Sequence, residues 1–98
     1  MATFITTIRF TEQGLQAIQE TTRRSAAFKT AVKKLGVKVS EIYWTLGAFD
    51  GVVVFEAPDD ETAIAAMLSL SSKGNVQTTT VRAFRAAEME KVVAKLAK

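Results

Sequence analysis

Only a few positions of this chain carry side chains that could bind or transform a ligand. A carboxylate and a guanidinium that share one cavity would suit a small polar or anionic ligand, and an aromatic ring beside them could stack on it. The candidate ligand-binding residues are Arg9, Tyr43, Trp44, Asp50, Glu56 and Arg82. These residue types predict a binding site, and no residue is assigned a catalytic role.

The aromatic pair and Asp50 each leave two interpretations open. Tyr43 and Trp44 are adjacent, so on a strand one ring should pack beneath the helices while the other reaches the opposite face. Their role is then core and interface packing, or stacking on a ligand. Asp50 either lines a barrel cavity, where burial would raise the pKa of its carboxyl group, or caps its own turn through a side-chain hydrogen bond.

The remaining charged candidates are open to similar alternatives. Glu56 ends an apolar strand, and Arg9 and Arg82 lie on other predicted strands, so either arginine could pair with it. A buried pair would need further hydrogen bonds to be tolerated. All three can equally be solvated charges at strand ends. The acidic run at 59–61 has the ligand types of a metal site, but acids at a helix N-terminus also stabilise the helix dipole, so we expect no metal there.

The chain contains no histidine and no cysteine, which narrows its chemistry. Ser-His and Cys-His nucleophile pairs are excluded, and so is ligation of zinc, haem or iron–sulfur clusters by the usual side chains. Any proton transfer would depend on Asp50, Glu56 or Tyr43. No disulfide can form, so nothing points to an oxidising compartment. We expect no cofactor.

Length and composition predict one domain spanning residues 1–98, because 98 residues at 48% hydrophobic content suffice for one core and not for two. The N-terminus lacks the basic start and apolar run of a signal peptide. The longest apolar run, 63–68, is far shorter than the roughly 20 residues that cross a bilayer. We therefore predict a cytoplasmic protein. Net charge is +3, and the basic residues from Arg23 to Lys38 are interpreted as the solvated face of a helix.

Periodicity and capping residues predict the elements that must position these side chains. Thr11 is placed to cap a first helix that Gly36 ends, and the polar stretch 20–25 predicts a kink or restart within it. The predicted strands are 3–10, 37–46, 52–55 and 76–84, with a hairpin turn at 47–51. A second helix begins at Asp59 and stops before Lys73, and a third occupies the C-terminus. Their apolar faces are expected at Ile64, Met67, Leu68 and Ser71, and at Met89, Val92, Val93 and Leu96.

This order, β-α-β-β-α-β plus a terminal helix, is the α+β plan called ferredoxin-like, with a four-stranded antiparallel sheet. Two helices can cover only one face of that sheet. On the third strand Val53 and Phe55 should face the helices. The open side would then carry Asp50, Val52, Val54 and Glu56. Because an exposed apolar face usually marks an interface, we predict a homodimer in which two sheets face each other.

Several segments resemble the GYD domain family. They are Thr11-Glu12-Gln13-Gly14, Ile42-Tyr43-Trp44-Thr45-Leu46-Gly47, the turn Gly47-Ala48-Phe49-Asp50, Glu56-Ala57-Pro58-Asp59-Asp60-Glu61, Gly74-Asn75-Val76 and Thr80-Val81-Arg82-Ala83-Phe84. The resemblance implies a ferredoxin-like fold of the dimeric α+β barrel type and little about activity. Phe49 stands where the family usually has tyrosine, and it lacks the hydroxyl through which a phenol donates a hydrogen bond or a proton.

Three classes of function follow. The first is a homo-oligomeric α+β barrel without a cofactor, which is structural or binds a small molecule between its sheets. The second is a cofactor-independent monooxygenase or isomerase acting in the inter-sheet cavity, an analogy of fold alone, so whether the chain is an enzyme stays open. The third is an RNA-binding module, which is disfavoured because Asp50 and Val52 occupy the positions of its stacking aromatics. The expected partners are a second copy and a small-molecule ligand, and neither nucleic acid nor membrane.

Overall fold

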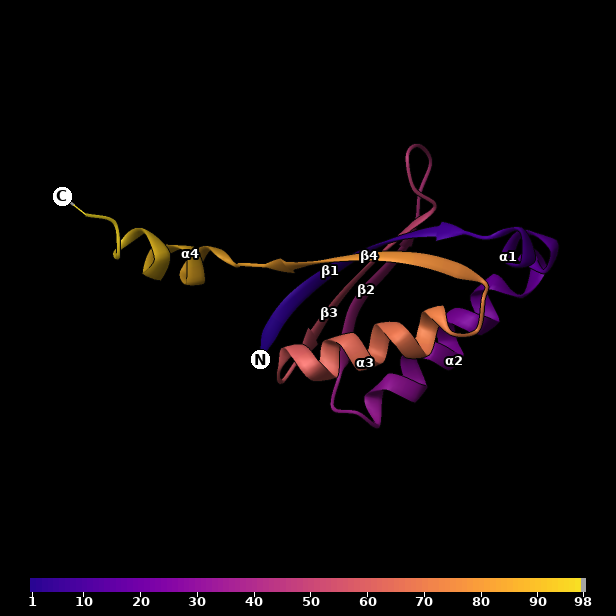
Figure 1. Ribbon diagram of the computed structural model, residues 1–98, viewed down its shortest axis with the longest axis horizontal. Coiled ribbons are helices and arrows are strands. Elements are labelled where there is room, and N and C mark those ends of the chain that lie inside the picture. Colours follow the sequence, from indigo (N-terminus) through magenta and orange to yellow (C-terminus); the bar gives the residue numbers. More distant parts are fainter. Residues whose placement is uncertain (98) are drawn as a thin grey trace.

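Four antiparallel strands form one sheet in the order β2-β3-β1-β4 in the computed structural model, which describes residues 1–97 (Figure 1). The elements are β1 (Ala2–Phe10), α1 (Glu12–Gln16), a 3-10 turn η1 (Ile18–Glu20), α2 (Thr21–Lys33), β2 (Lys38–Trp44), β3 (Gly51–Ala57), α3 (Asp60–Ser71), β4 (Val76–Ala83) and α4 (Ala86–Val93). The predicted βαββαβ fold with an additional C-terminal helix is confirmed. Within the described residues no helix is long and apolar enough to cross a membrane.

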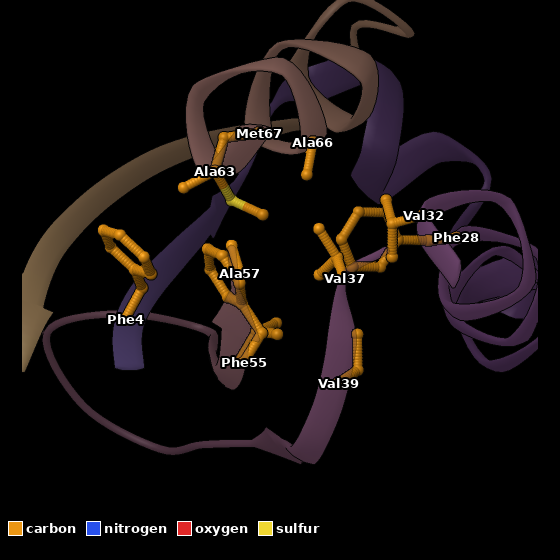
Figure 2. Packing of buried hydrophobic residues seen from close by; sticks show 11 residues of the cluster. Phe4, Phe28, Val32, Val37, Val39, Phe55, Ala57, Ala63, Ala66 and Met67 are labelled. Atoms are coloured by element: carbon orange, nitrogen blue, oxygen red, sulfur yellow. The ribbon is translucent and has the colours of Figure 1, made fainter. Parts of the chain in front are cut away.

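The alternation of buried and exposed side chains along β3 determines which face of the sheet is covered. Val53 and Phe55 are 2% and 0% exposed, whereas Val52 and Val54 are only partly buried on the other face. The prediction that Val53 and Phe55 face the helices, and Val52 and Val54 the open side, is confirmed. Phe4 lies opposite Phe55 in the β1–β3 register, and their rings stack 5.3 Å apart. Figure 2 shows Ala63 and Met67 of α3 above these rings, and Phe28 and Val32 of α2 beside Val37 in the same core cluster.

Local hydrogen bonds begin and end the helices where the sequence predicts. Thr11 Oγ1 accepts a hydrogen bond from the Gly14 amide at 3.1 Å, and Asp59 Oδ1 accepts one from the Thr62 amide at 2.7 Å. The bond from Thr62 holds the pKa of Asp59 below its ordinary value. Gly36 follows α2 with a φ of 86°, the left-handed conformation in which glycine has no steric penalty. The capping predictions are therefore confirmed.

The break in the first helical segment lies earlier than predicted. The polar stretch 20–25 suggested the kink, but α2 is continuous from Thr21, and the break is at Ala17 and η1. A side chain from the next helix stabilises this break. The Arg24 guanidinium donates to the carbonyl oxygens of Ala17 at 2.7 Å and Gly14 at 3.4 Å. These bonds satisfy acceptors that a continuous helix would have paired internally.

The predicted inward face of α3 is partly wrong. Met67 is buried as expected, but Ile64 and Leu68 are 60% and 63% exposed. Ala63 and Ala66 point towards the sheet in their place (Figure 2). Because the stacked rings of Phe4 and Phe55 already fill the space beneath α3, small side chains face them and the larger ones turn outward.

The C-terminal helix α4 stands apart from the rest of the fold. It continues the line of β4 away from the sheet and from both packed helices (Figure 1). None of the residues from Ala86 to Val93 is buried. The predicted apolar stripe on this helix is present, but it packs on nothing within the described chain.

Candidate functional site

A cleft of about 140 Å³ lies between α2 and the end of the sheet where the β2–β3 hairpin is attached. Its walls come from the N-terminal half of α2, the ends of β1 and β2, and the segment between α3 and β4. Most of the lining is apolar. The lining side chains include Ile8, Phe10, Phe28, Ile42 and Trp44, with the polar groups of Thr21, Arg24 and Asp50.

Trp44 is the aromatic residue that the fold directs into this cleft. Its indole Nε1 donates a hydrogen bond to Thr21 Oγ1 on α2 at 3.0 Å. A bulge between Val39 and Glu41 shifts the β2 register by one residue, so that Trp44 lies opposite Gly51 on the side of the sheet facing the helices. A Cβ atom at Gly51 would lie 3.0 Å from the Tyr43 carbonyl oxygen, so glycine allows the close approach of β2 to β3 at this point.

Tyr43 lies next to the cleft but belongs to the other face of the sheet, opposite Val52 in the register. Tyr43 is 53% exposed. The prediction that the two adjacent aromatic rings face opposite sides is confirmed. A side-chain hydrogen bond with Glu41, together with the charge of that carboxylate, raises the pKa of the Tyr43 phenol. The phenol therefore stays protonated at neutral pH and is unsuited to act as a general base.

Asp50 occupies a place that simple alternation did not predict. We expected it on the open face with Val52, but it precedes the first residue of β3 and borders the cleft on the helix side. Its Oδ2 accepts a hydrogen bond from the Phe10 amide at 2.8 Å, and its own amide donates to the Ile8 carbonyl oxygen at 2.7 Å. Asp50 thus ties the hairpin to the end of β1 instead of capping its own turn.

The polar groups of the cleft are largely engaged in holding the fold. The Thr21 hydroxyl accepts from Trp44, the Asp50 carboxylate accepts from Phe10, and the Arg24 guanidinium donates to α1 and Ala17. Sequence reasoning missed Arg24, because a basic residue in a run of basic residues has the pattern of a solvated helix face. What the cleft offers a ligand is shape and apolar surface, with Asp50 and Arg24 at its margin.

Two of the segments that resemble the GYD family meet in space beside this cleft. The Thr11 hydroxyl donates to the Gly74 carbonyl oxygen at 2.6 Å. The side-chain nitrogen Nε2 of Gln13 donates to the Lys73 carbonyl oxygen at 2.9 Å and to Asn75 Oδ1 at 3.0 Å. The start of the first helix is therefore joined to the turn before β4, and Lys73 and Asn75 of that turn line the cleft.

Glu56, Arg9 and Arg82 are not brought together. Glu56 pairs with Thr3 at one end of β1, and Arg9 lies six residues further along that strand, which is about 20 Å away. Arg82 forms its ion pair with Glu88 at 3.2 Å and stacks over the Phe84 ring. The carboxylate–guanidinium cavity suggested by the sequence is thus not assembled from these residues in the described chain.

The open face of the sheet carries a second candidate surface. Ile5 lies between Val54 and Val81 in one row of the register, and Tyr43 lies beside Val52 in the next. Val81 and Tyr43 are both more than half exposed. These residues, Ile5, Tyr43, Val52, Val54 and Val81, form what we call the open-face patch. The helices α2 and α3 lie on the other side of the sheet (Figure 1).

The chain is similar to known proteins over most of its length. The model of the GYD domain family matches residues 4–93. The glutamine synthetase and cystathionine beta-lyase binding protein of Thermus thermophilus is 34% identical over 90 residues, which cover 91% of this chain and 95% of that protein. The crystal structure of TTHA0845, also from Thermus thermophilus, has 27% identity and a TM-score of 0.58, with 88% of this chain and 96% of that one covered. The structure of FFRP-DM1 shares the fold at 17% identity and a TM-score of 0.56, covering 86% and 100%.

Proposed function

This chain belongs to the GYD domain family, and from that membership we propose that it is a protein-binding module that acts as a homo-oligomer. The open-face patch is the observation that carries the proposal. Scattered exposed apolar residues are ordinary, but a contiguous apolar surface on one face of a sheet marks an interface. A second copy would cover it by two-fold pairing, in which the same face is buried on both chains.

The Thermus relative supports the part of the proposal that concerns protein partners. Its name states that it binds glutamine synthetase and cystathionine beta-lyase, and this chain covers 95% of it at 34% identity. We extend the same class of activity, the binding of enzymes, to this chain. A homo-oligomer carries more than one copy of the surface that binds the partner enzyme. Several copies binding one enzyme at the same time strengthen the binding through avidity.

Val54→Lys is expected to halve the mass of the protein in solution, measured by size-exclusion chromatography with light scattering at micromolar concentration. A lysine in the middle of the open-face patch would be buried between two paired sheets with only Glu41 opposite it on β2, and burying such an ion pair costs more than leaving it in water. Ala26→Lys is the matched control, because Ala26 is exposed on α2 and lies outside the patch. A wild-type chain that runs at its monomer mass of 10.7 kDa would contradict the homo-oligomer.

The wild type, Val54→Lys and Ala26→Lys also test the protein-binding role. Biolayer interferometry with purified glutamine synthetase and cystathionine beta-lyase of the same organism should give binding by the wild type and Ala26→Lys, and weaker binding by Val54→Lys through loss of avidity. Failure of the wild type to bind either enzyme would contradict the protein-binding role. The homo-oligomer would still be tested separately, by the mass of the protein in solution.

A second candidate function is the binding of a small apolar molecule in the cleft beside Trp44. The cleft volume of about 140 Å³ is close to that of an engineered apolar cavity of about 150 Å³ that binds benzene. In this proposal the ligand lies on the helix side of the sheet, whereas the sequence had suggested the space between two sheets. Since Asp50 is hydrogen-bonded to the Phe10 amide, the cleft favours binding over proton transfer.

Trp44 is the one tryptophan of the chain, so its fluorescence reports on the cleft directly. We expect titration with cyclohexanol or benzyl alcohol to change the emission of the wild type with a saturable curve. Ala27→Leu, which fills the cleft, should weaken that binding at least tenfold. Ala26→Leu makes the same change at a neighbouring position that does not line the cleft, and it should bind as the wild type does. A linear response, or equal binding by both variants, would rule out this site.

A further inference from the structure

The walls of the cleft beside Trp44 carry more positive than negative charge. Its charged lining residues are the cations Arg24 and Lys73 and the anion Asp50. Within residues 1–97 neither of these cations lies in an ion pair. An apolar cleft with unpaired cations in its wall attracts an anion, because the charge is screened less there than in open water.

The hydrogen bonds of Arg24 hold its side chain in place without cancelling its charge. The guanidinium donates to the backbone carbonyl oxygens of Ala17 at 2.7 Å and Gly14 at 3.4 Å. A carbonyl group is a dipole with no net charge, so the positive charge remains. A guanidinium has five N–H donors, and these bonds use only two of them. Arg24 therefore keeps donors for a further acceptor in the partly buried place that it occupies.

The two cations belong to the same end of the cleft, where α1 meets the turn before β4. The side-chain nitrogen Nε2 of Gln13 on α1 donates to the Lys73 carbonyl oxygen at 2.9 Å, and Arg24 binds the carbonyl oxygen of Gly14 on the same helix. Figure 1 shows α1 and the start of β4 at one end of the sheet. This end of the cleft is therefore its basic end.

The carboxylate of Asp50 lies on the other side of β1. It accepts from the Phe10 amide, whereas the next amide along the chain, that of Thr11, donates to the Asn75 carbonyl oxygen. Successive amides of an extended chain point to opposite edges of the strand. Asp50 is thus separated from the turn before β4 by two strand spacings, about 10 Å, and does not neutralise the basic end.

We propose that the ligand of this cleft is a small molecule with an apolar body and one carboxylate group. The inference rests on the proposed function of the cleft as a small-molecule site, and it adds the charge of the ligand. The carboxylate binds at the basic end, to Arg24 and Lys73, and the apolar body lies against Ile8 and Phe28. Hydrogen bonds between a guanidinium and a carboxylate are stronger than those to a neutral oxygen, which favours the anion over an alcohol of the same shape.

Three compounds with the same ring test the charge of the ligand. At neutral pH benzoate is an anion, benzyl alcohol is neutral and benzylamine is a cation. We expect titrations followed by the emission of Trp44, the one tryptophan, to show benzoate binding about tenfold more tightly than benzyl alcohol at low salt. Benzylamine should bind more weakly than the alcohol. Salt at about 0.5 M should reduce the preference for benzoate, because it screens the cations.

Lys73→Met removes one cation of the basic end and keeps a long apolar side chain. The ratio of benzoate affinity to benzyl alcohol affinity should fall at least threefold in this variant. Lys29→Met is the matched control, because Lys29 is exposed on α2 and does not line the cleft, and it should keep the ratio of the wild type. The ratio compares two ligands on one protein, so a change in stability alone does not alter it.

The possible results separate this inference from the function on which it rests. Equal affinities for benzoate and benzyl alcohol, or tightest binding by benzylamine, would overturn the preference for a carboxylate and leave the cleft as a site. An unchanged ratio in Lys73→Met would overturn the position of the carboxylate at the basic end. A linear response of the wild type to all three compounds would contradict the cleft itself as a ligand site.

Discussion

Replacing Phe55 by alanine should lower the free energy of unfolding by about 3–5 kcal/mol, the cost usual for removing a buried phenylalanine. Phe55 is fully buried on the central strand β3, and its ring stacks on that of Phe4. The alanine would leave a cavity beneath α3, because Ala63 and Ala66 carry only methyl side chains, which are too short to fill it. A small domain has about 5–15 kcal/mol of stability, so much of it would be lost.

Urea unfolding followed by circular dichroism measures this effect, and Phe84→Ala is its control. Phe84 is 52% exposed and lies outside the core, so the same substitution there should cost less than about 1 kcal/mol. The measurement should be made at one fixed protein concentration, because association stabilises the folded state by mass action. Equal losses for the two variants would contradict the position of Phe55 at the centre of the core.

The second large effect is expected at Gly14, where alanine should destabilise the protein by about 1–3 kcal/mol. A Cβ atom at this position would lie 2.1 Å from the Asn75 carbonyl oxygen, which belongs to backbone and cannot turn away. The Asn75 carbonyl oxygen also accepts a hydrogen bond from the Thr11 backbone amide at 3.1 Å. Alanine stabilises a helix by about 1 kcal/mol relative to glycine. Helix propensity alone therefore predicts that Gly14→Ala makes the protein more stable.

Gln16→Ala provides the comparison, because Gln16 is exposed on the same short helix α1. It should leave the urea midpoint unchanged or raise it slightly, while Gly14→Ala lowers it. The Trp44 emission of Gly14→Ala should also change, since Asn75 lines the cleft and Arg24 binds the Gly14 carbonyl oxygen. If Gly14→Ala is as stable as Gln16→Ala, the close contact between α1 and the turn before β4 does not exist in solution.

Much of the architecture could be predicted from local patterns. The β-branched run 52–55 predicted the central strand, and its alternation correctly assigned Val53 and Phe55 to the core. Thr11 and Asp59 predicted helix starts, because a short oxygen-bearing side chain next to free amides is the local requirement for a cap. These predictions succeeded because each depends on atoms only a few residues apart.

The candidate site was less predictable, for reasons that particular residues make clear. Asp50 was assigned to the open face by extending the alternation of β3 by one residue, but the strand begins only at Gly51. Ile64 and Leu68 had the spacing of an inward face, yet Ala63, Ala66 and Met67 are the α3 residues buried against the sheet. Arg24 looked like a surface cation, and its bonds to α1 depend on how two helices meet.

By itself, then, the sequence determined the order of the strands and helices, the caps, and which side of β3 is apolar. Only the tertiary structure decided that Trp44 and not Tyr43 enters the cleft, that Glu56 lies far from Arg9, and that α4 is left unpacked. The physical reason is range. Alternation and capping act between neighbouring residues, whereas strand register and the bulge in β2 depend on hydrogen bonds and packing between distant parts of the chain.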